Sequence, residues 1–352
     1  LMPAVAPLLE AGRSSGENLI FVTGASRSGT TMLARILGKA GGLTLRELHF
    51  FGDLVAPDAI SDTVTREFAE STAAMLFARQ TRDYWAGEPT AEEREQASAV
   101  VQTLADDELV PAQIFATCIN QLLADADAEF AVEQTPRNIY YAASLLETYP
   151  AARVVSVIRD PRAVLASQKD RHKLRKLGGS GVPFREVIRL LVNYHPVTMT
   201  RLWKSAVNTA HRLAGKERFF VVRYEDLIME PDATVAGLFS SLGLEYDSKC
   251  LDVPHWGSSV SSHSSKGGLS RSSLDKWKTV LTGTEIRYCD AVTKDERNAF
   301  DYPTMTEATF GLGGLAGFAL RAPLHVIGLI ILSPRRLFVQ LRAMLQRSGR
   351  AA

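Results

Sequence analysis

Residues 23–33 read TGASRSGTTML and follow the apolar run NLIFV at 18–22. From Gly24 the glycines keep the Gly-x-x-x-x-Gly spacing of a phosphate-binding P-loop, between an expected strand and an expected helix. The position after the second glycine holds Thr30, where a nucleotide triphosphatase has its lysine, and a cation stands three positions earlier, at Arg27. The stretch therefore predicts an anion site built on backbone N–H groups, but one unsuited to triphosphate chemistry.

The segments around this loop predict an α/β fold. A buried strand is expected at 18–23, a helix at 29–39, and further strands at 129–134, 152–158 and 218–223, each followed by a helical pattern. Strands that alternate with helices form parallel sheets with right-handed crossovers. We therefore expect a P-loop-like three-layer fold, with a central parallel sheet flanked by helices.

Composition divides the 352 residues into three parts. We expect an N-terminal extension over 1–16, one α/β domain over 17–305 and an apolar, basic tail over 306–352. Within the domain, 56–127 is predicted to form a mostly helical insertion. The tail has no acidic residue after Glu307 and carries six arginines among its apolar runs: Arg321, Arg335, Arg336, Arg342, Arg347 and Arg350.

The overall charge and the cysteines exclude several classes of protein. Forty basic and 39 acidic residues give a net charge of +1, which makes no case for binding nucleic acid. The three cysteines are isolated in the sequence, which argues against a disulfide framework and suits a reducing compartment. The first residues show no secretory signal pattern. We therefore expect a cytoplasmic protein.

A second candidate site follows the strand at 152–158, in the run VIRDPRAVLASQ. Arg159 leaves the carboxyl end of that strand, which is the edge where open α/β sheets bind ligands. Ser167 follows eight residues later, two turns into the next helix. Taken alone, this motif leaves another interpretation open, in which Arg159 pairs with Asp160 or Glu133 and Ser167 is an ordinary helix residue.

Together the two motifs resemble the sulfotransferase family that uses 3′-phosphoadenosine-5′-phosphosulfate (PAPS). The resemblance rests on RSGTT at 27–31 and on EQTPRNIYYAASLLETYPAARVVSVIRDPRAVLAS at 133–167. VVRYEDLIMEP at 221–231 and SLDKWKTVLTGTE at 273–285 are similar to later segments of the family. It covers roughly residues 17–303 and is closest to the bacterial and tyrosylprotein-type branch.

The resemblance implies a donor site and no metal. It places Arg27 where negative charge grows on the leaving phosphate oxygen, and it places Arg159 and Ser167 on the 3′-phosphate. Residues of the serine- and glycine-rich segment at 256–275 are candidates for the same phosphate. The full set of expected donor-binding residues is Ser26, Arg27, Ser28, Gly29, Thr30, Thr31, Arg159, Ser167, Lys266, Ser270 and Arg271.

A base must take the acceptor's proton during in-line attack. In the tyrosylprotein-type branch a glutamate lies about twenty residues beyond the loop arginine, and Glu47 stands at that position here. His49 and Asp53 are rivals, because histidine is the base in the cytosolic small-molecule branch. This chain also departs from its relatives at Gln134, where they commonly carry a lysine, and Arg137 or Lys266 is a candidate to replace that charge.

The expected reaction is sulfuryl transfer to an acceptor hydroxyl, of a glycan, a glycolipid, a peptide tyrosine or a small metabolite. The helical insertion at 56–127, with Tyr84 and Trp85, is expected on the acceptor side. The tail at 306–352 suits either the inner face of an anionic membrane or a dock on protein. Two alternatives stay open: a P-loop kinase or triphosphatase, against which Thr30 counts, and a non-catalytic nucleotide-binding module associated with a membrane.

Overall fold

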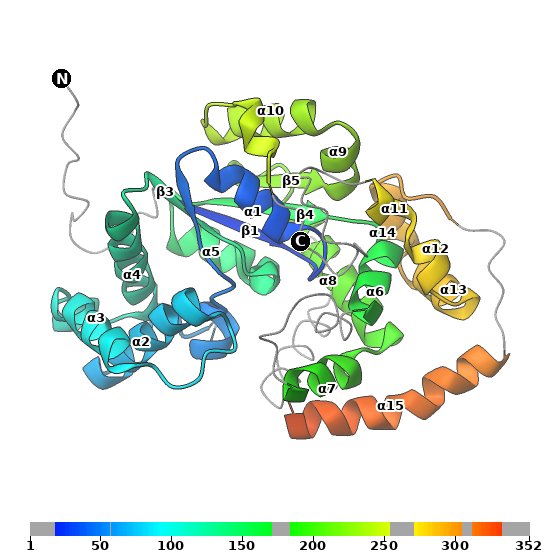
Figure 1. Cartoon of the computed structure of the whole chain (residues 1–352), viewed down its shortest axis with the longest axis horizontal. Coiled ribbons are helices and arrows are strands. Elements are labelled where there is room, and N and C mark those ends of the chain that lie inside the picture. The colour runs from blue at the N-terminus through cyan, green and yellow to red at the C-terminus, as the bar shows by residue number, and fades with distance from the viewer. Residues whose placement is uncertain (1–17, 57, 171–183, 254–270, 305–311, 333–352) are drawn as a thin grey trace, which may run out of the picture.

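A computed structural model describes residues 18–56, 58–170, 184–253, 271–304 and 312–332. At its centre lies a five-stranded sheet in the order β2-β3-β1-β4-β5, with all neighbours parallel (Figure 1). The predicted α/β fold is confirmed. The strands are β1 (Leu19–Gly24), β2 (Gly42–Thr44), β3 (Phe130–Glu133), β4 (Arg153–Ile158) and β5 (Phe219–Arg223).

Helices cover both faces of the sheet because its strands are apolar on both sides. In β1, Ile20 and Val22 join one buried cluster and Leu19 and Phe21 join the other. The first cluster takes side chains from the helices above the sheet in Figure 1, and the second takes them from those below. The upper helices are α1 (Thr30–Gly38), α9 (Tyr224–Met229) and α10 (Pro231–Leu242); the lower ones include α5 (Ala142–Thr148) and α8 (Pro196–Leu213).

Three helices lie in the range 56–127: α2 (Arg66–Arg82), α3 (Ala91–Gln102) and α4 (Pro111–Ala126). Threonine side chains accept hydrogen bonds from the first turns of α2 and α3, and proline begins α4. The group packs on the lower face through the aromatic ring of Phe115, whose centroid lies 6.2 Å from that of Phe21.

The remaining helices follow β4 or the last strand. Between the longer elements lie short helical turns, η1 (Phe50–Leu54), η2 (Asp106–Glu108), η3 (Pro136–Tyr141) and η5 (Ser248–Leu251). The other helices are α6 (Pro161–Lys169), α7 (Phe184–Asn193), α11 (Ser272–Asp275), α12 (Trp277–Val280), α13 (Gly283–Val292), α14 (Lys294–Ala299) and α15 (Leu312–Leu332).

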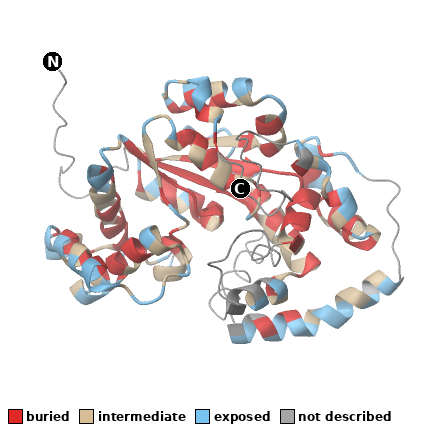
Figure 2. Cartoon of the chain, viewed as in Figure 1, coloured by how far each residue is buried: buried red, intermediate tan, exposed pale blue. Residues whose placement is uncertain are grey.

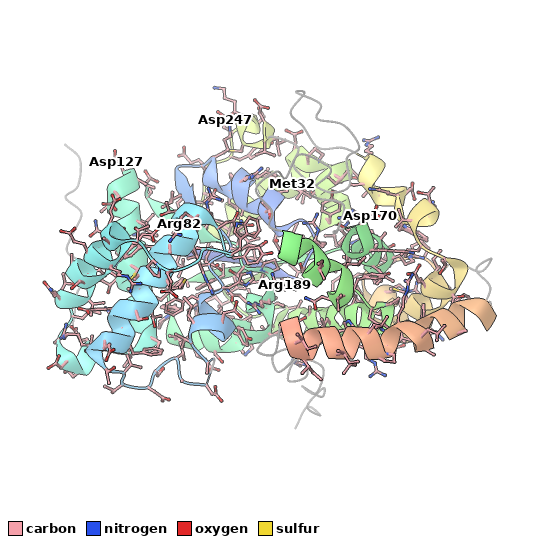
Figure 3. All side chains as sticks on the ribbon, turned by 60° about the horizontal axis from the view of Figure 1, so that its bottom comes forward. Met32, Arg82, Asp127, Asp170, Arg189 and Asp247 are labelled. Carbon is pink, nitrogen blue, oxygen red and sulfur yellow. The ribbon has the colours of Figure 1, made fainter. Side chains whose placement is uncertain are left out.

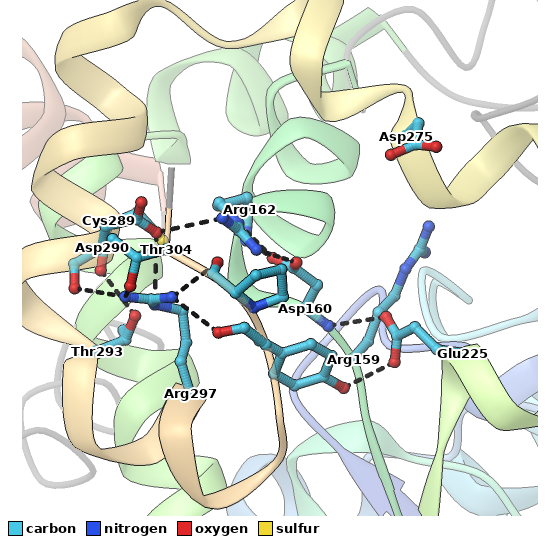
Figure 4. A network of polar contacts seen from close by, with 12 residues as sticks. Arg159, Asp160, Arg162, Glu225, Asp275, Cys289, Asp290, Thr293, Arg297 and Thr304 are labelled. Atoms are coloured by element: carbon cyan, nitrogen blue, oxygen red, sulfur yellow. Dashed lines mark hydrogen bonds and ion pairs between the residues drawn. The ribbon is translucent and has the colours of Figure 1, made fainter. Parts of the chain in front are cut away.

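A buried arginine ties α6 to the helices that follow the sheet (Figure 4). Arg162 donates to both carboxylate oxygens of Asp160, at 2.9 and 2.6 Å, and its guanidinium lies 4.3 Å from the ring centroid of Trp277. Asp290 of α13 stands 3.6 Å from Arg162 and 3.4 Å from Arg297. These buried charges neutralise one another, and they hold α12–α14 against the end of the sheet.

The helix α15 occupies part of the apolar, basic tail and packs on the body of the protein. It lies beside α7 at the lower edge of Figure 1, and its outward side is exposed in Figure 2. His325 bonds to the Val192 carbonyl at 2.9 Å and to the Thr198 hydroxyl at 2.9 Å. This helix therefore follows the predicted alternative in which the tail packs on protein. Among the helices that the structure describes, none is long and apolar enough to cross a membrane.

Candidate active site

The loop between β1 and α1 has the backbone geometry of a phosphate-binding loop. Gly24 and Gly29 have φ angles of 146° and 105°, and a Cβ at either would lie 2.4–2.5 Å from Val157 O or the Tyr224 ring. Arg27 also adopts a positive φ, 80°, which is uncommon outside glycine. This strained turn directs the Arg27 side chain toward Ser167 and the Arg27 carbonyl toward Arg159.

The start of α1 is arranged to receive an anion. Gly29 is the N-cap and no side chain caps the first turn, so the N–H groups of Thr30 and Thr31 lack intrahelical acceptors. The Ser28 hydroxyl is fully buried, with no hydrogen-bond partner among the described residues. Thr30 is buried and Thr31 half-buried at the same turn. Such a set of donors fits the oxygens of a phosphate.

The structure brings the two predicted motifs together. Arg27 Nε donates to Ser167 Oγ at 3.1 Å, across 140 positions of sequence. Arg159 donates from Nη1 to the Arg27 carbonyl at 3.1 Å and from Nη2 to the Ser273 carbonyl at 2.9 Å. Its guanidinium stacks 4.1 Å from the ring centroid of Tyr224. Arg159 therefore bonds carbonyls, not Asp160 or Glu133.

The structure describes only some of the remaining residues that were predicted to bind the donor. The Ser26 carbonyl accepts a hydrogen bond from Gln168 of α6 at 3.0 Å, which joins the loop to the helix that carries Ser167. Arg271 is exposed and directly precedes α11. Lys266 and Ser270 lie outside the described residues.

The candidate bases lie after β2, in a network of charged side chains. His49 Nε2 lies 3.2 Å from Glu47 Oε2, and Arg137 Nε donates to His49 Nδ1 at 2.9 Å. Since Arg137 can only donate, Nδ1 accepts and the neutral ring carries its proton on Nε2, facing Glu47. Burial, with the charge of Arg137, lowers the pKa of His49 to about 4. Asp53 pairs with Arg137 on its other side.

A second carboxylate lies behind this network. Glu133 is buried at the end of β3 and accepts hydrogen bonds from the backbone N–H and hydroxyl of Thr135 and from Asn138. Burial raises the pKa of Glu133 to about 7, and the charge of Glu47 acts in the same direction. The Thr135 hydroxyl also accepts a hydrogen bond from the backbone N–H of His49 at 3.1 Å. Glu133 therefore fixes the turn that supports His49.

Gln134, which stands where related enzymes commonly carry a lysine, has a buried side-chain amide. Its side-chain carbonyl has no hydrogen-bond partner among the described residues. Arg137, a candidate to replace the missing lysine, has Nε and Nη2 already bonded to His49 and Asp53.

Aromatic side chains stand beside the candidate bases. The ring of Tyr84 lies 5.4 Å from His49 and 4.6 Å from Trp85, which is partly exposed. Arg189 of α7 approaches the other side of Tyr84, 6.0 Å from its centroid. Two aromatic rings thus adjoin His49, the partner of Glu47, between the end of α2 and α7.

Three contributors were missed from the sequence. Ser273 holds Arg159 through its carbonyl and Tyr224 through its hydroxyl, at 2.9 Å. Tyr224 also forms the wall beneath Gly29. Gln168 follows Ser167 directly. No local pattern distinguishes these residues, because their roles depend on contacts across more than 40 positions.

Comparison with known proteins agrees with this geometry. The curated omega-hydroxy-beta-dihydromenaquinone-9 sulfotransferases Stf3 of Mycobacterium bovis and Mycobacterium tuberculosis are 30% identical over 112 residues. That alignment spans 32% of this chain and only 28% of those relatives.

Solved structures share the fold. The sulfotransferase domain from the curacin biosynthetic pathway superposes with a TM-score of 0.51 at 17% identity, covering 84% of this chain and 100% of that domain. The sulfotransferase domain of the Synechococcus PCC 7002 olefin synthase superposes with a TM-score of 0.50 at 17% identity. The superposition covers 84% of this chain and 98% of that domain. The model of the sulfotransferase family matches residues 19–248, about two thirds of the chain. The chain therefore belongs to the sulfotransferase family.

Proposed function

We propose that this protein transfers a sulfuryl group from PAPS to an acceptor hydroxyl by in-line displacement. One observation carries the proposal: Arg27, Arg159 and Ser167 converge at the carboxyl edge of the sheet, beside a helix start with no side-chain cap. An anionic donor with phosphates at both ends matches such a double site. Family membership supports the same donor.

Each end of the donor site has its own set of groups. The N–H groups at the start of α1, with the hydroxyls of Ser28, Thr30 and Thr31, bind the 5′-phosphate. Ser167 and Arg159 bind the 3′-phosphate, and Arg271 adds charge from the rim. Ser167 Oγ accepts from Arg27, and its own O–H donates to a phosphate oxygen, so one hydroxyl links Arg27 to the donor.

The proposed chemistry moves one proton and exchanges one bond at sulfur. As the acceptor oxygen bonds to sulfur, the bond from sulfur to the phosphate oxygen breaks, and Arg27 neutralises the charge that grows on that oxygen. The acceptor's proton passes to the carboxylate of Glu47.

Glu47 is favoured over its rivals by its surroundings. Its side chain is 28% exposed, whereas that of His49 is 6% exposed and has both ring nitrogens bonded. Asp53 is held by Arg137 and Arg79. We propose that His49 orients Glu47 through its Nε2 proton.

The acceptor side suits an alcohol with an apolar or aromatic body. The ring of Tyr84 contacts His49 edge-on, and the ring of Trp85 contacts Tyr84 in the same way. Two relatives are named for a reaction on a menaquinone, a lipid-borne molecule. We infer that the acceptor hydroxyl of this protein also sits on an apolar molecule, a glycolipid among the candidates.

The test uses radiolabelled PAPS with a panel of phenols and long-chain alcohols. Glu47→Gln is expected to lower turnover by about 10²–10⁴-fold, while the desulfated nucleotide binds as before. The matched control is Glu88→Gln, a carboxylate that is 90% exposed and pairs with Arg94 on the surface. Normal turnover in Glu47→Gln would exclude it as the base. A wild-type protein that binds the nucleotide but transfers to no acceptor would favour the non-catalytic alternative.

A further inference from the structure

The helix α15 is apolar on two opposite sides. Its inner side fits the body tightly: a Cβ at Gly328 would lie 1.8 Å from a methyl of Val192, and one at Gly314 would lie 2.1 Å from the Thr284 hydroxyl. Phe318 and His325 complete this side through His195, whose ring stacks on that of His325 at 5.2 Å. Packing with the body therefore uses one stripe of the helix and leaves the other.

The outer side is a continuous apolar stripe in solvent. Leu320, Leu324, Ile327 and Ile331 follow one another at steps of four, three and four residues, which places them on one face. They are 75%, 68%, 52% and 68% exposed. Val326 and Ile330 widen the stripe at 48% and 54%. Large exposed side chains gathered in this way mark an interaction surface.

Charge identifies the occupant as an anionic bilayer. Arg321 lies on the exposed part of α15, and the 45 residues after Glu307 contain six arginines, no lysine and no acidic residue. A second copy would carry the same positive charge in its own tail, which opposes pairing of two copies. An anionic membrane surface accepts both the apolar stripe and the positive charge.

The position of α15 connects this surface to the acceptor side. His325 of α15 bonds to α7 at Val192, and α7 presents Arg189 to Tyr84, next to His49. Figure 3 shows α7, which carries Arg189, directly above α15. One helix thus separates the stripe from the proposed acceptor wall.

We propose that the outer stripe of α15 docks on an anionic membrane and presents the acceptor side to a lipid-borne hydroxyl. The membrane contact stands by itself; the choice of acceptor rests on the proposed function. Because one side of α15 packs on the body and the other faces the bilayer, the helix lies in the interface and does not cross the membrane.

The experiment is flotation of the full chain with vesicles of phosphatidylcholine, alone or mixed with phosphatidylglycerol. The wild type is expected to float with the mixed vesicles, less so at high salt. The double variant Leu324→Glu, Ile327→Glu is expected to bind at least about tenfold more weakly, because two exposed apolar side chains lose their burial. Met229→Glu, an exposed apolar residue on α9, is the matched control and is expected to float like the wild type.

Two outcomes overturn the proposal. One is a wild type that stays unbound with anionic vesicles; a dimer that the double variant dissociates would then assign the stripe to a second copy. The other is a double variant that floats like the wild type. Binding of the desulfated nucleotide, measured on the same samples, shows that the variant is folded. It also separates failure of the membrane contact from failure of the proposed function.

Discussion

Two carboxyl groups lie near the His49 network, Glu47 after β2 and Glu133 at the end of β3, and their environments differ. Glu47 is partly exposed and contacts the ring proton of His49, whereas Glu133 is fully buried. The negative charge of Glu47 adds to the burial that raises the pKa of Glu133 to about 7. This raised pKa keeps part of the Glu133 population protonated near neutral pH, which distinguishes its carboxyl group from that of Glu47, the proposed base.

Glu133 predicts a pH dependence of stability. Its pKa is about 7 in the folded protein, against 4.5 for the free group, so the folded state binds more protons between these values. The stabilisation is present below pH 4.5 and is lost as pH rises through about 7. Relative to Glu133→Gln, the wild type is expected to lose on the order of 3 kcal/mol of unfolding free energy across this window.

Urea denaturation of both proteins at several pH values measures this difference. The comparison cancels other groups that titrate in the same range, including His49. A difference that stays constant with pH, or that grows in favour of the wild type as pH rises, would contradict a raised pKa.

At this scale the sequence predicted the residues with a motif and missed those without one. Arg27 was predicted from the glycine spacing of the loop. Arg159 and Ser167 were predicted from their positions after the end of a strand. The bond of Arg137 to His49 was not foreseen, because 88 positions separate them and only the pairing of β2 with β3 brings them together. Lys266 and Ser270 lie outside the described residues and stay predictions.

At the scale of elements, the turn from β4 into α6 serves two purposes. Asp160 caps α6 by accepting from the Arg162 N–H at 2.8 Å, and Pro161 occupies the first helical position. Arg159 then faces the donor site, while Arg162 faces Trp277 and Asp290. One short turn therefore positions the ligand side of the sheet and anchors the later helices.

Arg162→Met is expected to destabilise the protein by about 3–5 kcal/mol, because Asp160 and Asp290 lose a buried cation. The Arg162 side chain is 1% exposed, so water cannot replace it. Thermal and urea unfolding measure the loss, with Arg94→Met as control, since that arginine is 55% exposed. A loss below about 1 kcal/mol, typical of a surface pair, would show that the network does not hold α13.

Elements with strong periodicity were predicted to within one or two residues, as at β1, β4, β5 and α1. The strand β2 has three half-buried residues, too few for a pattern, and gains its place by pairing with β3. In α15 the sequence showed apolar runs with arginines. The sequence could not show that α15 has one side packed on the body and another in solvent, because this division depends on contacts with distant helices.

For the whole molecule, the proposed donor site draws on distant parts of the chain. The loop after β1, the start of α6 and the segment at Ser273 meet through Arg159 and Ser167. A ligand that bonds to all three adds its binding free energy to the stability of the entire domain. Because the proposed site needs all three parts, unfolding of any of them releases the ligand.

The desulfated nucleotide is therefore expected to raise the melting temperature. At a hundredfold excess over its dissociation constant, the stabilisation is about 2.7 kcal/mol, or roughly 4 °C for a chain of 352 residues. Arg27→Ala is expected to reduce the increase at equal ligand concentration, because it removes the cation next to Ser167. Arg94→Ala, remote and exposed, is expected to retain it. Differential scanning fluorimetry measures all three proteins; a wild type that does not shift would contradict the donor site, and an unchanged shift in Arg27→Ala would remove Arg27 from it.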